Sequence, residues 1–154
     1  MIGSVDESQS EEQDEVGFEL NRFVQSLRIR LGDAAKIESE QLTQQIRRTN
    51  IVPVVGTACS VSIVEMGKVE LIVKVAGGRW ELGRSNDTLD FFKRVVESSI
   101  KGDVTEIFGL ERVETRVAFP EGTSVKTTTR TLGGIFPTPG WRHWGRKVKY
   151  EPYQ

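Results

Sequence analysis

The feature that most constrains this chain is a change of hydrophobic period near residue 51, from helical spacing to strict alternation. In the segment 68–75 (KVELIVKV) every second residue is valine or leucine. A period of two is typical of a strand with one buried face. Alternation or a β-branched run predicts five more strands, at 51–55, 59–65, 79–82, 110–119 and 124–131.

Short links that contain glycine or proline separate most of these predicted strands. Turn-forming residues occur at 66–67, 77–78 and 120–122. Links this short join neighbouring strands that run in opposite directions. The sheet should therefore be mostly antiparallel.

Three segments outside the strands are predicted to be helical. From Val16 to Leu31 the apolar residues recur at helical spacing, and the same is true from Asp87 to Ile100. Each pattern is a single apolar stripe, as in a helix that covers a core. A weaker and mostly polar helix is predicted from about residue 33 to 48, on the surface of the protein.

This order of elements predicts an α+β fold. We expect a two-layer sandwich in which two to three helices pack on one face of a mostly antiparallel sheet of about five to six strands. The length of 154 residues fits one such domain, at 15–136. We expect residues 1–14 to be an acidic disordered tail, because they hold almost no large apolar group. Residues 137–154 are a Pro/Trp/basic C-terminal segment that either docks on the domain or binds a partner.

The net charge of −1 conceals a separation of acidic and basic residues along the chain. Residues 1–15 contain six acids and no base, which leaves 16 of the 22 acids and all 21 bases for the rest. Such polarity can indicate an anionic partner for the basic part. The alternative is a solvating tail in front of an ordinary charged surface.

The first candidate binding site is one side of the predicted strand pair 110–131. Basic residues alternate there, and Arg112, Arg116, Lys126 and Arg130 are expected to project to the same side. A basic sheet face can follow a phosphate backbone, and the basic residues of 68–75 would extend it if their strand is adjacent. The alternative is a solvated face of mixed charge.

The second candidate site is the aromatic and basic segment 141–150 (WRHWGRKVKY). Tryptophan and arginine are enriched at binding hot spots. The candidate partner-binding residues in this segment are Trp141, Arg142, Trp144, Arg146 and Lys147. The alternative is that both tryptophans dock onto the sheet and that KVKY adds an edge strand.

Histidine and cysteine occur once each, as His143 and Cys59. Most metal sites and most nucleophilic catalysis depend on these side chains, and no glycine motif for phosphate binding is present. Cys59 lies in a β-branched run, where a buried and inert thiol is the usual case. We therefore expect no catalytic residue, no cofactor and no metal. An enzyme that works through carboxylates alone is the third hypothesis.

The sequence favours a non-enzymatic protein-interaction domain, such as an adaptor, an assembly component or an inhibitor-like partner, which binds another protein or itself. The alternative is a nucleic-acid-binding domain that uses the basic sheet face and the basic C-terminal segment. The sequence shows no apolar run of about 18 residues and no secretory signal, which predicts a soluble protein without a membrane span. Its single cysteine favours the cytoplasm.

Overall fold

The alternating segments fold into two antiparallel sheets instead of the single sheet expected. The computed structural model describes residues 7–130 and 140–154, with side chains from Glu15 onward. The first sheet has the order β1-β2-β3-β4-β5, with strands β1 (Ala35–Gln41), β2 (Ile46–Pro53), β3 (Val61–Met66), β4 (Glu70–Val75) and β5 (Gly78–Gly83). The second sheet has the order β8-β7-β6-β9, with strands β8 (Ser124–Arg130), β7 (Arg112–Ala118), β6 (Val104–Gly109) and β9 (Arg146–Lys149).

The described residues also form two long helices, one short helix and a 3-10 turn. These are α1 (Glu7–Leu31), η1 (Gly32–Ala34), α2 (Asn86–Ile100) and α3 (Trp141–Trp144). All neighbouring strands in both sheets are antiparallel. The predicted α+β class and the antiparallel pairing are therefore confirmed.

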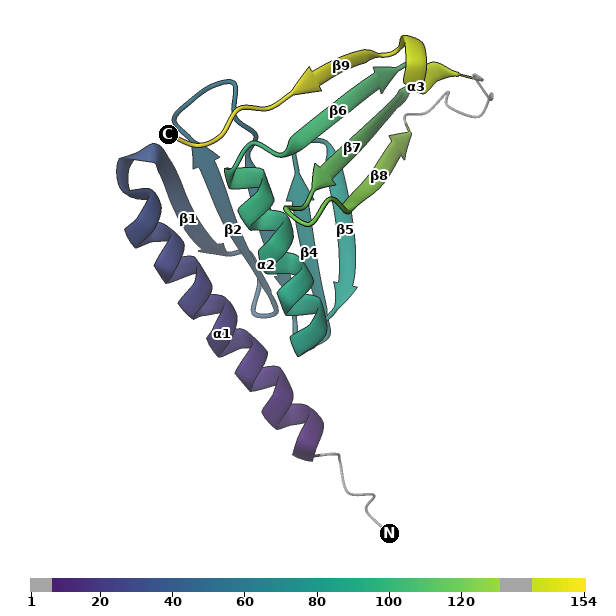
Figure 1. Cartoon of the computed structure of the whole chain (residues 1–154). Coiled ribbons are helices and arrows are strands. Elements are labelled where there is room, and N and C mark those ends of the chain that lie inside the picture. The colour runs from purple at the N-terminus through teal and green to yellow at the C-terminus, as the bar shows by residue number, and fades with distance from the viewer. Residues whose placement is uncertain (1–6, 131–139) are drawn as a thin grey trace.

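The main core lies between the first sheet and the two long helices. Figure 1 shows α1 and α2 on the same face of this sheet. Leu71, Val73 and Val75 of β4 are fully buried, as their alternation predicted, and they join Leu27 of α1 and Phe92 of α2 in one cluster. Burying side chains of this size stabilises a fold by about 1.5–3 kcal/mol each.

Local sequence determines both ends of α2. At its start, Thr88 N–H donates to Ser85 Oγ over 3.3 Å, and Ser85 N–H donates to Thr88 Oγ1 over 3.0 Å. This reciprocal capping satisfies backbone donors that a helix start leaves free. Beyond its end, Gly102 has a φ of +82°, and a Cβ there would lie 2.6 Å from the backbone N of Pro152. Glycine therefore allows both the turn and the close passage of the C-terminal segment.

The prediction of a weak helix over residues 33–48 is wrong. Most of this segment forms β1 and the start of β2, which pair along the whole length of β1. Ala35 and Ile37 contribute to the core, and Ser39 Oγ lies 2.9 Å from Thr49 Oγ1 on the neighbouring strand. Pairing with a neighbouring strand thus overrides a polar composition that suits a surface helix.

Besides β1, one more strand has no counterpart among the strands predicted from the sequence. It is β6, which lies between β7 and β9 in the second sheet. Glu106 is buried on one face of β6 and Ile107 on the other, so the segment shows no alternation of apolar and polar residues. β9 is the edge strand that the alternative interpretation of KVKY predicted.

Helix α1 begins at Glu7, inside the stretch 1–14 that the sequence predicts to be disordered. Residues 1–6 lie outside the described residues, as do residues 131–139, and with them the predicted domain limit at 136. Among the helices in the described part of the chain, none combines the length and the apolar composition that crossing a bilayer requires.

A buried carboxylate joins the two sheets. Glu106 of β6 is 3% exposed and accepts hydrogen bonds from Gly77 N–H over 3.1 Å, from Thr115 Oγ1 over 3.0 Å and from the Tyr150 hydroxyl. Gly77 belongs to the turn between β4 and β5, Thr115 to β7, and Tyr150 to the C-terminal segment. The first sheet, the second sheet and the C-terminal segment therefore converge on one side chain.

The variant Glu106→Ala should lose about 2–4 kcal/mol of unfolding free energy, because it leaves three donors without their acceptor and opens a cavity. Urea denaturation followed by tryptophan fluorescence measures this loss. Glu38→Ala is the matched control, since Glu38 pairs with Lys36 on the exposed surface, and it should change stability by about 0.5 kcal/mol or less. A loss for Glu106→Ala no larger than that of the control would contradict the role given to Glu106.

Candidate functional site

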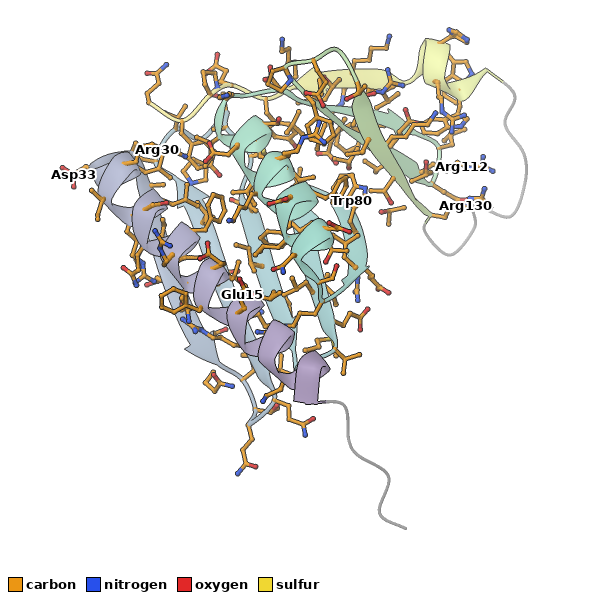
Figure 2. All side chains as sticks on the ribbon, turned by 60° about the horizontal axis from the view of Figure 1, so that its bottom comes forward. Glu15, Arg30, Asp33, Trp80, Arg112 and Arg130 are labelled. Carbon is orange, nitrogen blue, oxygen red and sulfur yellow. The ribbon has the colours of Figure 1, made fainter. Side chains whose placement is uncertain are left out.

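The predicted basic residues of β7 and β8 come together on one face of the second sheet. Arg112 lies opposite Arg130, and Arg116 lies opposite Lys126. Residues directly opposite each other on antiparallel strands share a face, and Figure 2 shows Arg112 and Arg130 close together. Arg116, Lys126 and Arg130 are exposed, and Arg112 is half-buried.

The short strand β9 widens this face. Thr105 of β6 lies opposite both Arg116 of β7 and Lys149 of β9. Two positions further along β6, Ile107 lies opposite Lys147. Since every second residue of a strand points the same way, Lys147 and Lys149 lie on the same face as Arg116. Lys149 is not among the residues predicted from the sequence, although its spacing from Lys147 in the RKVK run signals a shared face.

Helix α3 covers one end of the same face. A Cβ on Gly109 of β6 would lie 2.5 Å from the Trp141 ring, so the ring packs against the backbone where a side chain is missing. Trp141 is buried, and the Arg142 guanidinium lies over its ring, 4.9 Å from the centroid. We call this surface the basic face, and it consists of Arg112, Arg116, Lys126, Arg130, Arg142, Lys147 and Lys149.

A buried acid lies at the centre of the basic face. Glu114 has no exposed surface, and it accepts hydrogen bonds from Arg116 over 3.0 Å and from Arg142 Nε over 2.5 Å. Burial alone would raise the pKa of this carboxyl, but the two arginines outweigh burial and hold its pKa below the ordinary value. Among the described strand residues on this face, Glu114 is the only acid. The part of the face that meets solvent is therefore cationic.

Two pairs of like charges lie directly across β7 and β8. The pairs are Arg112 with Arg130 and Arg116 with Lys126, and like charges in such positions destabilise a sheet. Basic residues on the edge strand β8 can be explained by protection against unwanted strand pairing. That explanation does not extend to Arg112 and Arg116, because β7 lies between β6 and β8. Glu114 offsets part of this repulsion through its contact with Arg116, and an anion bound at this face would offset more.

The structure does not bring all predicted site residues together. Arg146 lies on the opposite face of the second sheet, where its guanidinium is 5.0 Å from the centroid of the Phe108 ring. Trp144 ends α3 and is 54% exposed, in contrast to buried Trp141. Lys74 belongs to the first sheet, where β4 pairs with β3 and β5, so it does not extend the basic face through a neighbouring strand.

The lone cysteine and the lone histidine are in different surroundings. Cys59 is buried, and burial raises the pKa of its thiol to about 12, which keeps the thiol protonated near neutral pH. Its carbonyl accepts a hydrogen bond from the Tyr153 hydroxyl over 2.6 Å. His143 is exposed in α3. Among residues 15–130 and 140–154, no group of histidine, cysteine and acidic side chains has the arrangement of a metal site.

Comparison of the chain with models of protein families, with curated proteins and with solved structures found no match. The roles of the residues therefore follow from their geometry and their chemistry alone.

Replacing Glu114 should reduce the loss of stability in acid. Because the pKa of Glu114 is lower in the folded protein than in the unfolded chain, its contribution is complete above the unfolded value of about 4.3 and is lost as the pH falls through the folded value. Urea denaturation at several pH values between about 2 and 7 should thus show a shallower decline for Glu114→Gln than for the wild type.

At neutral pH the same variant should be less stable by about 2 kcal/mol, because two arginines lose a charged acceptor. Glu38→Gln removes an acid from an exposed ion pair and is the control, which should keep the wild-type dependence on pH. An acid profile of Glu114→Gln that superimposes on the wild-type profile would refute the link between Glu114 and acid stability.

Proposed function

We propose that the protein is a non-enzymatic protein-interaction domain whose basic face binds an acidic segment of a partner protein. The observation that carries the proposal is the placement of like charges opposite each other across β7 and β8. Among the described strand residues of this face, the one acid is buried beneath Arg116 and Arg142. Such an arrangement exposes cations to solvent, and the repulsion between them lowers the stability of the sheet. A partner that supplies carboxylates would relieve this repulsion.

The size of the basic face suits a short segment of a partner. Four strands about 4.8 Å apart span about 14 Å, and four residues along a strand, the separation of Arg112 and Arg116, also span about 14 Å. Carboxylate groups match the forked donors of arginine, which can hold them with two parallel hydrogen bonds. A short helix or an extended peptide rich in Asp and Glu fits both the area and the charge.

Trp144 offers a partner an exposed apolar side chain near the basic residue Arg142 in sequence. It is 54% exposed and lies in the same short helix as Arg142. Tryptophan and arginine are both enriched at interface hot spots. We therefore expect the partner to place an apolar residue against Trp144 next to its acidic residues.

A nucleic acid is the second candidate partner, because Lys149, Arg116 and Lys126 form one row across the sheet that phosphates could follow. An acidic protein segment is favoured over a single strand, since the described strand residues on the basic face include no aromatic side chain on which bases could stack. The free thiol of Cys59 is consistent with the reducing cytoplasm, where we propose that the protein works.

The test compares two fluorescent probes, a polyglutamate peptide and an oligothymidine of similar length. Fluorescence anisotropy at about 50 mM salt and at rising salt should show peptide binding that weakens as charges are screened. The double variant Lys126→Glu/Arg130→Glu reverses two exposed charges on β8 and should weaken peptide binding by about tenfold or more. Circular dichroism checks that the variant keeps its fold.

The matched control is Lys36→Glu/Lys74→Glu, which changes the net charge equally but alters exposed strand residues of the first sheet. It should weaken binding by no more than about threefold, through long-range charge alone. Equal effects of the two double variants, or no peptide binding at low salt, would overturn the proposal. Binding of the oligothymidine without binding of the peptide would favour the nucleic-acid alternative.

A further inference from the structure

The acidic residues of this chain are concentrated where α1 begins. Residues 1–15 contain six acids and no base, and α1 starts at Glu7. Val16 is the first residue of α1 that the structure shows buried in the core. The acidic stretch thus precedes the part of α1 that holds the helix against the first sheet.

The acidic start of α1 and the basic face lie far apart in one molecule. The 25 residues of α1 make a helix about 37 Å long. In Figure 1 the start of α1 points away from β9 and α3, which lie at the other end of the molecule. Figure 2 likewise shows Glu15 on α1, well apart from Arg112 and Arg130. While α1 stays folded, the two regions can meet only between two molecules.

We infer that one partner of the basic face is a second copy of this chain, which inserts the acidic start of its own α1. This inference rests on the proposed binding of acidic protein segments by the basic face. Six acids face seven bases in such a contact, and each side also offers an exposed aromatic ring. Phe18 follows the acidic stretch and is 62% exposed, and Trp144 is 54% exposed in the same short helix as Arg142 of the basic face.

This contact is head-to-tail, because two different surfaces meet. Each copy in the contact keeps one unused surface, either its own acidic helix start or its own basic face. A head-to-tail contact that does not close into a ring adds copies without limit. The area of the basic face is small compared with stable interfaces, so the association should be weak and should fall as salt screens the charges.

Sedimentation velocity at rising protein concentration tests the inference. At about 50 mM salt the wild type should form species larger than a monomer, and at about 500 mM salt it should return to the monomer. Two variants should remain monomeric on their own. One has amides in place of the six acids (Asp6→Asn, Glu7→Gln, Glu11→Gln, Glu12→Gln, Asp14→Asn and Glu15→Gln), and the other is Lys126→Glu/Arg130→Glu.

A mixture of these two variants provides the decisive control. The amide variant keeps its basic face and the charge-reversed variant keeps its acidic helix start, so together they can form one contact and no more. The mixture should therefore give a one-to-one complex that does not grow with concentration. A loss of association caused by misfolding of either variant would abolish this complex as well.

The outcomes separate the inference from the proposed function. A wild type that stays monomeric at low salt, while polyglutamate binds the basic face, overturns self-association and leaves the proposed function standing. Association of the amide variant that equals that of the wild type also overturns the inference. Failure of both self-association and peptide binding overturns the two together.

Discussion

A buried carboxylate, Glu106, connects the second sheet to the first sheet and to the C-terminal segment. Glu106 faces the body of the protein, and its neighbours on β6, Thr105 and Ile107, must then face away from it. Burying a carboxylate is unfavourable unless donors surround it, and here a backbone amide and two hydroxyl groups do so. Because these donors come from both sheets and from the C-terminal segment, Glu106 acts with the buried Val104 and Val117 on the same face to hold that face inward.

A second buried acid, Glu114, affects the charge of the basic face. Glu106 is surrounded by neutral donors, whereas Glu114, on the opposite side of the same sheet, is held by Arg116 and Arg142. Both arginines are about half exposed, so each contributes to the cationic surface while it neutralises the acid below it. The sheet can therefore concentrate positive charge at its surface without an uncompensated charge in its interior.

The sequence predicts those parts of this fold whose two faces differ in polarity. The alternation in β4, the apolar stripe of α2 and the four basic positions on β7 and β8 are all visible in it. Prediction from the sequence fails at β6, because both faces of that strand are buried. It also fails at β1, because strand pairing overrides the local composition there. Arg142 and Lys149 join the basic face through long-range contacts with Glu114 and with β6, so the sequence does not predict that the C-terminal segment and the strand pair 110–131 form one surface.

Strand β9 pairs with a strand that lies about forty positions earlier, whereas β6, β7 and β8 are joined by short hairpins. Closing so long a loop costs more chain entropy than forming a hairpin. We therefore expect the C-terminal segment to detach from β6 more readily than the hairpin strands detach from one another. Its release would remove Tyr150 from Glu106 and Arg142 from Glu114 in one event. Glu114 would then keep only Arg116 of the two arginines that hold it, and the face would also lose Lys147 and Lys149, so docking of this segment adds to the attraction for anions.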